Sequence, residues 1–289
     1  MSDTFQRHAP QFFNYARERY NILLNRRAGL PREEWTVDPV LKTWSFCNIF
    51  REDDKVTEWF RTHIRDPLKN DKRVLFATIA FRWFNSINAG EVLKPYLLEG
   101  VWPVEELKPL LEARKAADGK IVTGAYIIKT PPKLSKIDAL LHLIALTHRM
   151  EGGIMLVWDY TSLERSWDAV RTIPYMGDFT SYEVVTDLRH TKMLRDATDV
   201  HTWANPGPGC AAGLGELFHQ DRDYYNRHSS YHRKRMMEEM QLLLAMSQQN
   251  KYWSHGWPQW ELREVEHTLC EFDKYRRGQQ GLRLKRRYR

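Results

Sequence analysis

The sequence is poor in cysteine and contains neither a long hydrophobic run nor a nucleotide-binding glycine loop. Cys47, Cys210 and Cys270 are odd in number and far apart, which argues against a disulfide framework and against a zinc site. We therefore expect a protein of a reducing cytoplasm. No apolar run approaches the roughly 20 residues that cross a bilayer, and the N-terminal MSDTFQRHAP lacks the apolar region of a secretion signal. The absence of a G-x-x-x-x-G-K-[ST] run indicates that a P-loop kinase step is not encoded here.

Aromatic residues and a basic C-terminus are what the chain does have. Eleven Trp and twelve Phe indicate a folded core. The formal net charge is +7, and residues 276–289 hold seven Lys or Arg and no acid. The other 275 residues are therefore neutral overall. Such a tail is typical of a phosphate-binding arm, which adds affinity without base recognition; a merely solubilising or disordered tail is the alternative. The candidate DNA-binding residues here are Arg276, Arg277, Lys285, Arg286 and Arg287.

Apolar residues recur at helical spacing along most of the chain. We expect helices over 11–26, from Pro39 onward behind Asp38 as N-cap, and over 54–64, 71–87, 104–117, 135–150, 163–172, 179–190, 221–248 and 260–276. The β-branched run Lys120–Thr130 predicts a short hairpin or an extended loop. The fold class is therefore all-α, with two helical lobes meeting at a cleft within residues 1–275, followed by the basic tail 276–289.

The segment IPYMGDFTSYEVVTDLR (173–189) is followed by DVHTW (199–203). This order resembles the hairpin and catalytic loop of helix-hairpin-helix DNA glycosylases: an apolar residue, Pro, two residues, Gly, a helix, then Asp-x-His. A turn ending in Gly177 can present amides of the next helix to a DNA phosphate. An ordinary capped helix connection is the alternative. The resemblance implies DNA contacts by Pro174, Gly177 and Phe179 and catalysis by Asp199 and His201.

Four further runs narrow the resemblance. FCNIFREDDKVTEWF (46–60), FRWFN (81–85), NPGPGCAAGL (205–214) and VEHTLCEFDKY (265–275) are similar to the α-glutamyl/putrescinyl thymine pyrophosphorylases. These amino acid:DNA transferases act in phage-type thymine hypermodification. The resemblance implies that an amine of an amino acid or polyamine displaces (pyro)phosphate from phosphorylated 5-hydroxymethyluracil in DNA. A separate 5-hydroxymethyluracil DNA kinase would supply that substrate in the host cytoplasm. No cofactor or resident metal is implied, and a need for Mg²⁺ stays open.

This reaction needs cations for the leaving group and a base for the amine. Candidates in the motifs are Arg51, Asp54, Arg82, Asn85, Glu266, Asp273 and Lys274. Glu266 and Asp273 are offset by only about 20° on a helix and can face one cleft, whereas a solvated helix face is the ordinary alternative. Arg51 and Asp54 can instead pair on a helix surface.

The other candidates also have structural interpretations. Arg82 and Asn85 can belong to a buried network or bind a ligand. The turn 205–209 can bring the backbone of Gly207 and Gly209 close to a phosphate, although Gly and Pro mark turns in general.

Two other functions compete with the transferase. A monofunctional helix-hairpin-helix DNA glycosylase would use Asp199 to stabilise the sugar cation. Its lyase variant is disfavoured because Phe179 stands where such enzymes place lysine. A non-catalytic DNA-binding module would keep the hairpin and the tail but would not need Asp199 or the acidic helix.

Overall fold

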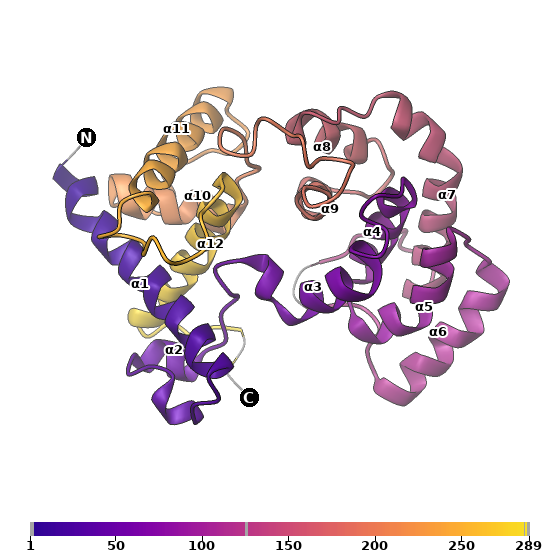
Figure 1. The fold of residues 1–289 in the computed structure, drawn as a ribbon, viewed down its shortest axis with the longest axis horizontal. Helices are drawn as coiled ribbons and strands as arrows, with labels where there is room; N and C mark the ends of the chain where they lie inside the picture. Colours follow the sequence, from indigo (N-terminus) through magenta and orange to yellow (C-terminus); the bar gives the residue numbers. More distant parts are fainter. Residues whose placement is uncertain (1–2, 125–126, 286, 288–289) are drawn as a thin grey trace. The chain divides into compact units, whose positions relative to one another are not determined.

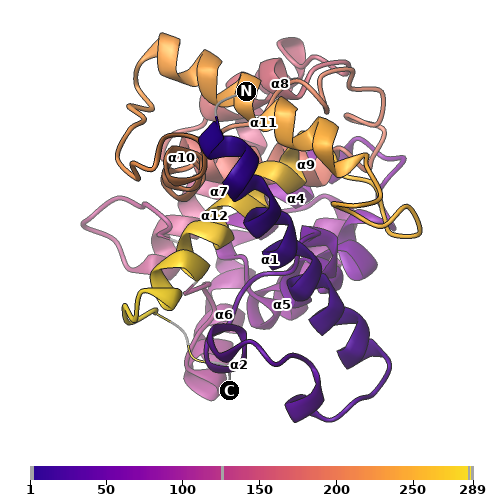
Figure 2. The same ribbon diagram turned by 90° about the vertical axis from the view of Figure 1, so that its left-hand side faces the viewer.

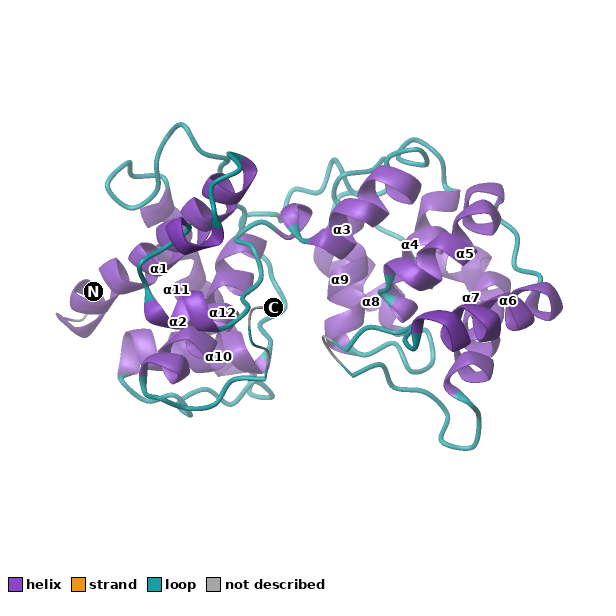
Figure 3. Ribbon diagram, turned by 90° about the horizontal axis from the view of Figure 1, so that it is seen from below, coloured by secondary structure: helices purple, strands orange, loops and turns teal. Residues whose placement is uncertain are grey.

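A computed structural model of the chain describes residues 3–124, 127–285 and 287, and within these ranges the fold consists of helices and loops. Figure 3 shows no strand in the described part; the one ladder-like contact there is an isolated bridge between Trp44 and Arg287. The prediction of an all-α protein is confirmed. No helix of the described residues is long and apolar enough to cross a membrane.

The chain divides into two compact units (Figure 1). Unit 1 comprises Met1–Asp54 and Val200–Arg289, and unit 2 comprises Lys55–Asp199. The expected cleft between two lobes stays a prediction, as does the domain boundary at residue 276.

Unit 1 is built around its last helix. Its helices are α1 (Asp3–Arg27), α2 (Pro39–Thr43), α10 (Pro208–Leu214), α11 (Ser230–Ser247) and α12 (Leu262–Gln279), with a π-helical turn at Gly215–His219. Helix α12 packs on the other four, and α1 crosses it (Figure 2). Phe12 of α1 meets Trp260 and Phe272 edge-on, with ring centroids 6.0 and 5.6 Å apart. Such pairs of aromatic rings add to the burial energy of the core.

The sequence predicts a turn at 205–209, and helix α10 begins within it. Its first turn begins at Pro208, a position that tolerates proline because its missing N–H has no helical partner. A Cβ on Gly213 would lie 2.6 Å from the Leu269 carbonyl oxygen, and one on Gly209 would lie 2.5 Å from the Cys270 sulfur. The glycines therefore allow α10 to lie directly against α12.

Unit 2 surrounds the buried helix α4. Its helices are α3 (Lys55–Phe60), α4 (Arg73–Phe84), α5 (Ile87–Glu99), α6 (Val104–Asp118), α7 (Lys136–Leu156), α8 (Leu163–Arg171) and α9 (Asp178–Leu188), with a π-helical turn at Arg61–Arg65. Every residue of α4 from Val74 to Phe84 is buried. A helix that is apolar on all sides is expected at the centre of a bundle, and α4 contacts α5, α7 and α9.

Two expected helix boundaries differ from the fold. The helix expected over 71–87 ends at Asn85, whose left-handed backbone (φ 45°) closes α4, and α5 then begins at Ile87. Helix α11 begins at Ser230, nine residues after the expected start, because Ser229 caps it by accepting from the His232 amide. For the segment Lys120–Thr130 the sequence left a hairpin or an extended loop open; its described residues are loop without strand, and residues 125 and 126 lie outside the description.

A fully buried ion pair joins α4 to α9. The guanidinium of Arg82 donates to both carboxylate oxygens of Asp187, at 2.5 and 2.7 Å. It also donates to the side-chain oxygens of Asn85, at 2.7 Å, and Thr57, at 3.1 Å. The side chains of Arg82 and Asp187 are 1% and 0% exposed. The structure therefore gives Arg82 and Asn85 the network interpretation, since their polar groups are satisfied inside unit 2.

We predict that Asp187→Ala lowers the free energy of unfolding of unit 2 by about 3–5 kcal/mol, because it leaves the Arg82 charge buried and unpaired. Urea denaturation followed by circular dichroism measures the effect. The double variant Arg82→Met/Asp187→Leu should recover most of the loss. Lys108→Ala, which breaks the exposed pair with Asp138, is the control and should cost less than about 1 kcal/mol. Equal losses in Asp187→Ala and the control would contradict the prediction.

Candidate functional site

The first candidate site is the hairpin between α8 and α9 in unit 2. The connecting turn places Tyr175 in the left-handed region (φ 65°) and Gly177 at the N-cap of α9. Ile173 and Met176 are buried and anchor the turn, whereas Tyr175 and Phe179 are 47% and 45% exposed. The structure confirms the two helices expected on either side of the turn, whereas the helix-hairpin-helix motif itself stays a prediction. The contact of Pro174, Gly177 and Phe179 with DNA stays a prediction.

Gly177 leaves the start of α9 open. Its φ is −81°, so the backbone itself does not require glycine. A Cβ at this position would meet no atom within 4 Å. What glycine provides is therefore an unobstructed approach to the first amides of α9. The neighbouring Asp178 carboxylate lies 2.8 Å from the Arg171 guanidinium, which offsets its negative charge at the helix start.

Asp199 caps α8 from a distance of 36 residues. One of its carboxylate oxygens accepts from the Leu163 amide at 2.8 Å. The other accepts from the Ser162 hydroxyl at 2.8 Å and from the Glu164 amide at 3.1 Å. A carboxylate at a helix N-terminus satisfies amides that lack helical partners and interacts favourably with the helix dipole. The structure thus shows a capping role for Asp199, and His201 is exposed in unit 1; catalysis by either residue stays a prediction.

We predict that Asp199→Ala destabilises unit 2 by about 1–2 kcal/mol, the usual cost of losing a side-chain cap. Chemical denaturation measures it. Asp199→Asn retains an acceptor oxygen and should lose less than half as much. The exposed carboxylate of Asp196 supplies the control, Asp196→Ala, which should change stability by less than about 0.5 kcal/mol. An Asp199→Ala variant as stable as the wild type would refute the capping role.

The second candidate site lies in unit 1, where the segment 45–54 docks on α12. Glu271 accepts from the Cys47 amide at 2.9 Å. The Lys274 ammonium donates to the Ser45 carbonyl at 2.6 Å and to Glu271 at 3.1 Å. It also lies 4.5 Å from the centre of the Phe46 ring. Two residues of α12 therefore hold this segment in place.

The far end of the same segment is fixed by Asn48. Its backbone amide and its side-chain amide both donate to Oδ1 of Asp54, at 2.9 and 3.1 Å. Its own side-chain oxygen accepts from the Arg19 guanidinium at 2.7 Å. The Asp54 carboxylate is thus bound by Asn48, and the charge of Arg51 also acts on it; a pair of the two on a helix surface stays a prediction.

Ionisable groups from both segments meet at this place. Ligand atoms of Cys47, Asp54 and His267 all lie within 4.8 Å of one another. Burial raises the pKa of the Cys47 thiol well above its usual value and also raises the pKa of Asp54. Burial, followed by the charges of Arg51 and Arg263, lowers the pKa of His267 well below its usual value. The imidazole is therefore neutral near pH 7, the form that binds metal ions.

The structure brings together some of the predicted catalytic residues and separates others. Asp54 belongs to the cluster just described, and the charges of Arg51 and Lys274 act on Cys47 and His267 of that cluster. Sequence reasoning missed Cys47. His267, Glu271 and Lys274 lie at positions i, i+4 and i+7 of α12 and therefore share one face of that helix. Arg82 and Asn85 lie in unit 2, in the buried network.

Glu266 and Asp273 point to other partners. Glu266 accepts from the Gly207 amide at 3.1 Å, just before α10. Asp273 is bound by Arg222, at 2.5 and 3.1 Å. Gly207 and Gly209 thus lie against α12, and their assignment to DNA stays a prediction, as does catalysis by Glu266 and Asp273.

The basic tail begins as helix and then folds back. Arg276 and Arg277 lie within α12, where Arg276 is 2.8 Å from Glu216 and Arg277 is 3.3 Å from Asp273. Farther on, a cavity of about 270 Å³ is lined by Trp44, Arg283, Leu284, Lys285 and Arg287. Leu284 is buried, which anchors this part of the tail. Arg286 lies outside the described residues, and DNA binding by the tail stays a prediction.

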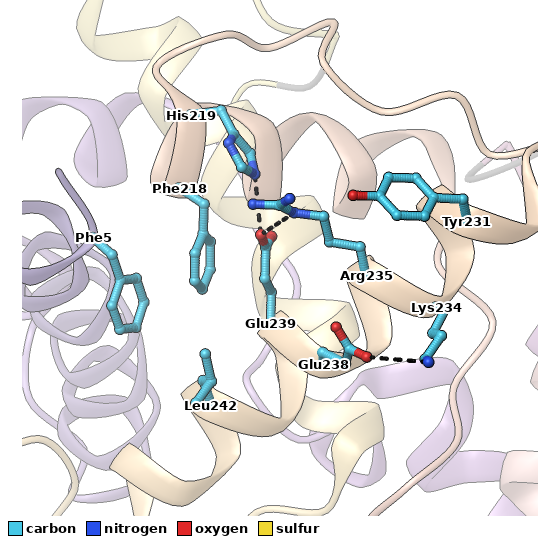
Figure 4. Close-up of a pocket in the computed structure, with 9 residues that line it drawn as sticks. All are labelled: Phe5, Phe218, His219, Tyr231, Lys234, Arg235, Glu238, Glu239 and Leu242. Atoms are coloured by element: carbon cyan, nitrogen blue, oxygen red, sulfur yellow. Dashed lines mark hydrogen bonds and ion pairs between the residues drawn. The ribbon is translucent and has the colours of Figure 1, made fainter. Parts of the chain in front are cut away.

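Unit 1 also has a cavity of about 450 Å³ that sequence reasoning did not anticipate (Figure 4). It is lined by Phe5, Phe218, His219, Tyr231, Lys234, Arg235, Glu238, Glu239 and Leu242. At its floor, Glu239 accepts from His219 at 3.0 Å, from Arg235 at 3.2 Å and from Tyr225. The volume falls in the range of small-molecule pockets. The Glu239 carboxylate, however, already accepts hydrogen bonds from three protein side chains.

Comparisons with known proteins point away from the transferase. The model of a family described as "5-hmdU DNA kinase, helical domain" matches residues 6–282. A "5-hmdU DNA kinase" of Bacillus phage SP10 is 29% identical over 287 aligned residues, which cover 89% of this chain and 43% of that protein. No solved structure matches the chain. The predicted amino acid:DNA transferase family and its amine-transfer reaction are therefore wrong, and the glycosylase alternative is not supported either.

Proposed function

Because the chain belongs to the family of 5-hmdU DNA kinase helical domains, we propose that it takes part in the phosphorylation of 5-hydroxymethyldeoxyuridine in DNA. The match over residues 6–282 is the observation that carries this proposal. The chain spans 43% of the length of the relative from phage SP10, so the kinase activity of that whole protein is not transferred with the match. We assign to the helical chain the binding of the modified DNA.

The chemistry of the substrate explains why such a part is needed. The hydroxymethyl group occupies the position of the thymine methyl at the major-groove edge of the base. Phosphoryl transfer requires this hydroxyl to lie in line with the γ-phosphate of the nucleotide, and positioning supplies most of the catalysis. A protein that grips the DNA backbone beside the target base would provide that positioning, with or without swinging the base out of the duplex.

The hairpin of unit 2 supports the assignment. The space beside Gly177 is free of side chains, so a backbone phosphate could approach the N-terminus of α9, where amide N–H groups can donate to it. The exposed rings of Tyr175 and Phe179 offer faces on which a base can stack. The tail of unit 1 offers a second contact, since Arg283, Lys285 and Arg287 line one cavity with Trp44.

The proposal is tested with duplex DNA that carries 5-hydroxymethyluracil at one position and with the matched thymine duplex. We expect the purified chain to bind the first more tightly, by about fivefold if one hydrogen bond to the hydroxyl is gained. With γ-labelled ATP and a nucleotide-binding kinase unit of the same family, we expect the chain to raise label transfer to the hydroxymethyl nucleoside. Equal binding of both duplexes together with unchanged label transfer would reject the proposed function.

The hairpin has its own test. Gly177→Val should weaken DNA binding at least about tenfold, because a branched side chain would cover the α9 amides, whereas the open space around Gly177 predicts unchanged folding. Gly256→Val is the matched control, since Gly256 is exposed and has a single atom within 4 Å of an added Cβ, Ser254 Oγ at 3.9 Å. Fluorescence anisotropy with labelled duplex measures both variants. Wild-type affinity in Gly177→Val would remove the hairpin from the DNA interface.

The tail is tested through the salt dependence of binding. The triple variant Arg283→Gln/Lys285→Gln/Arg287→Gln should lower the slope of log K against log salt by up to about 2.7, at about 0.9 per phosphate contact. The control neutralises three exposed lysines of unit 2, Lys115, Lys129 and Lys133, and should leave the slope near the wild-type value. Equal slopes in the tail variant and the wild type would exclude the tail.

A further inference from the structure

We propose that Cys47, Asp54 and His267 form a binding site for one divalent cation of the zinc type. The site lies within unit 1, where the segment 45–54 docks on α12, and it is independent of the proposed function. The sequence argued against a zinc site because the cysteines are few and far apart. That holds for sites built from several cysteines, whereas here one cysteine is joined by a carboxylate and an imidazole.

The three side chains match the ligand chemistry of zinc. Thiolate, imidazole and carboxylate are its usual protein ligands, at about 2.3 Å for sulfur and about 2.0–2.2 Å for nitrogen and oxygen. Two ligands on one ion are therefore separated by at most about 4.5 Å. The ligand atoms of Cys47, Asp54 and His267 all lie within 4.8 Å of one another, so small side-chain adjustments bring them onto one ion.

The imidazole is oriented as metal-bound histidines are. Among the described residues, Nε2 of His267 is buried and has no hydrogen-bond partner. The other side of the ring is bound by the backbone of Asn48. Ligating histidines commonly donate their second ring N–H to a carbonyl, which fixes the tautomer and aims the other nitrogen at the metal. A buried nitrogen left without a partner otherwise costs free energy.

The carboxylate is oriented by the same residue. Both hydrogen bonds that Asn48 makes to Asp54 are accepted by Oδ1, and this leaves Oδ2 as the oxygen that can face a cation. Asn48 is itself 5% exposed and held by Arg19. One buried asparagine thus positions two of the three ligands, as partners behind a metal site do.

The surrounding charges define the kind of site. Glu271 and Asp54 add negative charge near Cys47, and Arg51 and Lys274 add positive charge; Arg263 also acts on His267. Three protein ligands leave a fourth tetrahedral position open, as in catalytic zinc sites. The neighbouring cations favour an anionic oxygen at that position, because it would offset their charge.

The experiment titrates the chelator-treated full chain with Co²⁺ under reducing conditions. We expect one equivalent to bind with the near-ultraviolet thiolate band and the visible bands of tetrahedral cobalt, and Zn²⁺ to displace it. X-ray absorption of the zinc-loaded wild type should show one sulfur and two or three nitrogen or oxygen ligands. A spectrum without the thiolate band, or a shell of oxygen alone, overturns the proposal without recourse to any variant.

Variants then locate the site. Cys47→Ser should abolish the thiolate band, and Asp54→Asn and His267→Asn should weaken Co²⁺ binding at least about tenfold, with folding checked by circular dichroism. Cys270→Ser is the matched control, because Cys270 is a partly buried cysteine of α12 that lies against Gly209; it should keep both the band and the affinity. Persistence of the band in Cys47→Ser, or its loss in Cys270→Ser, would also overturn the proposal.

Discussion

The ion pair between Arg82 and Asp187 is the constraint on which unit 2 depends. A charged pair with no exposed surface is tolerated only when every donor and acceptor is satisfied, and Asn85 and Thr57 complete that requirement. Because Asn85 also ends α4 in the left-handed region, one polar residue both closes the central helix and completes the network. The pair holds α9 against α4. Because α9 follows directly on the turn of the hairpin, the buried pair also helps to fix the position of the hairpin.

Helix α12 organises unit 1 in a similar way, because its polar residues bind two different segments of the chain. Glu271 and Lys274 hold the segment 45–54 in place, whereas Glu266 binds the start of α10. In the sequence these charged residues of α12 look like a solvated helix face. In the structure most of them bind other segments of unit 1. This is why many of the residues selected for chemistry turned out to have structural partners.

The sequence predicted the helical class and most helix positions because apolar periodicity reports directly on which face is buried. It missed α5, since nothing in Phe84-Asn85-Ser86 shows that Asn85 adopts φ 45° and starts a new direction. It missed α10 because Gly and Pro mark turns in general, whereas here Pro208 starts a helix and Gly213 allows contact with α12. Of the candidate site, the shared face of His267, Glu271 and Lys274 follows from their helical spacing in the sequence. Cys47 could not be predicted as part of the site, because the fold brings it close to His267 although the two are 220 positions apart in the sequence.

The motifs that suggested an amine transferase are better understood by what they do in the fold. The run 46–60 supplies the loop that docks on α12 and then the whole of α3, and the run 81–85 supplies the buried arginine and the end of α4. Such contacts serve packing, so the order of these motifs indicates a scaffold before it indicates a reaction. Reaction type has to be argued from groups other than those that fasten segments to one another. The proposed DNA contacts and the proposed metal site therefore rest on the start of α9, the cations of the folded-back tail and the ligand atoms beside Asn48, and not on motif order.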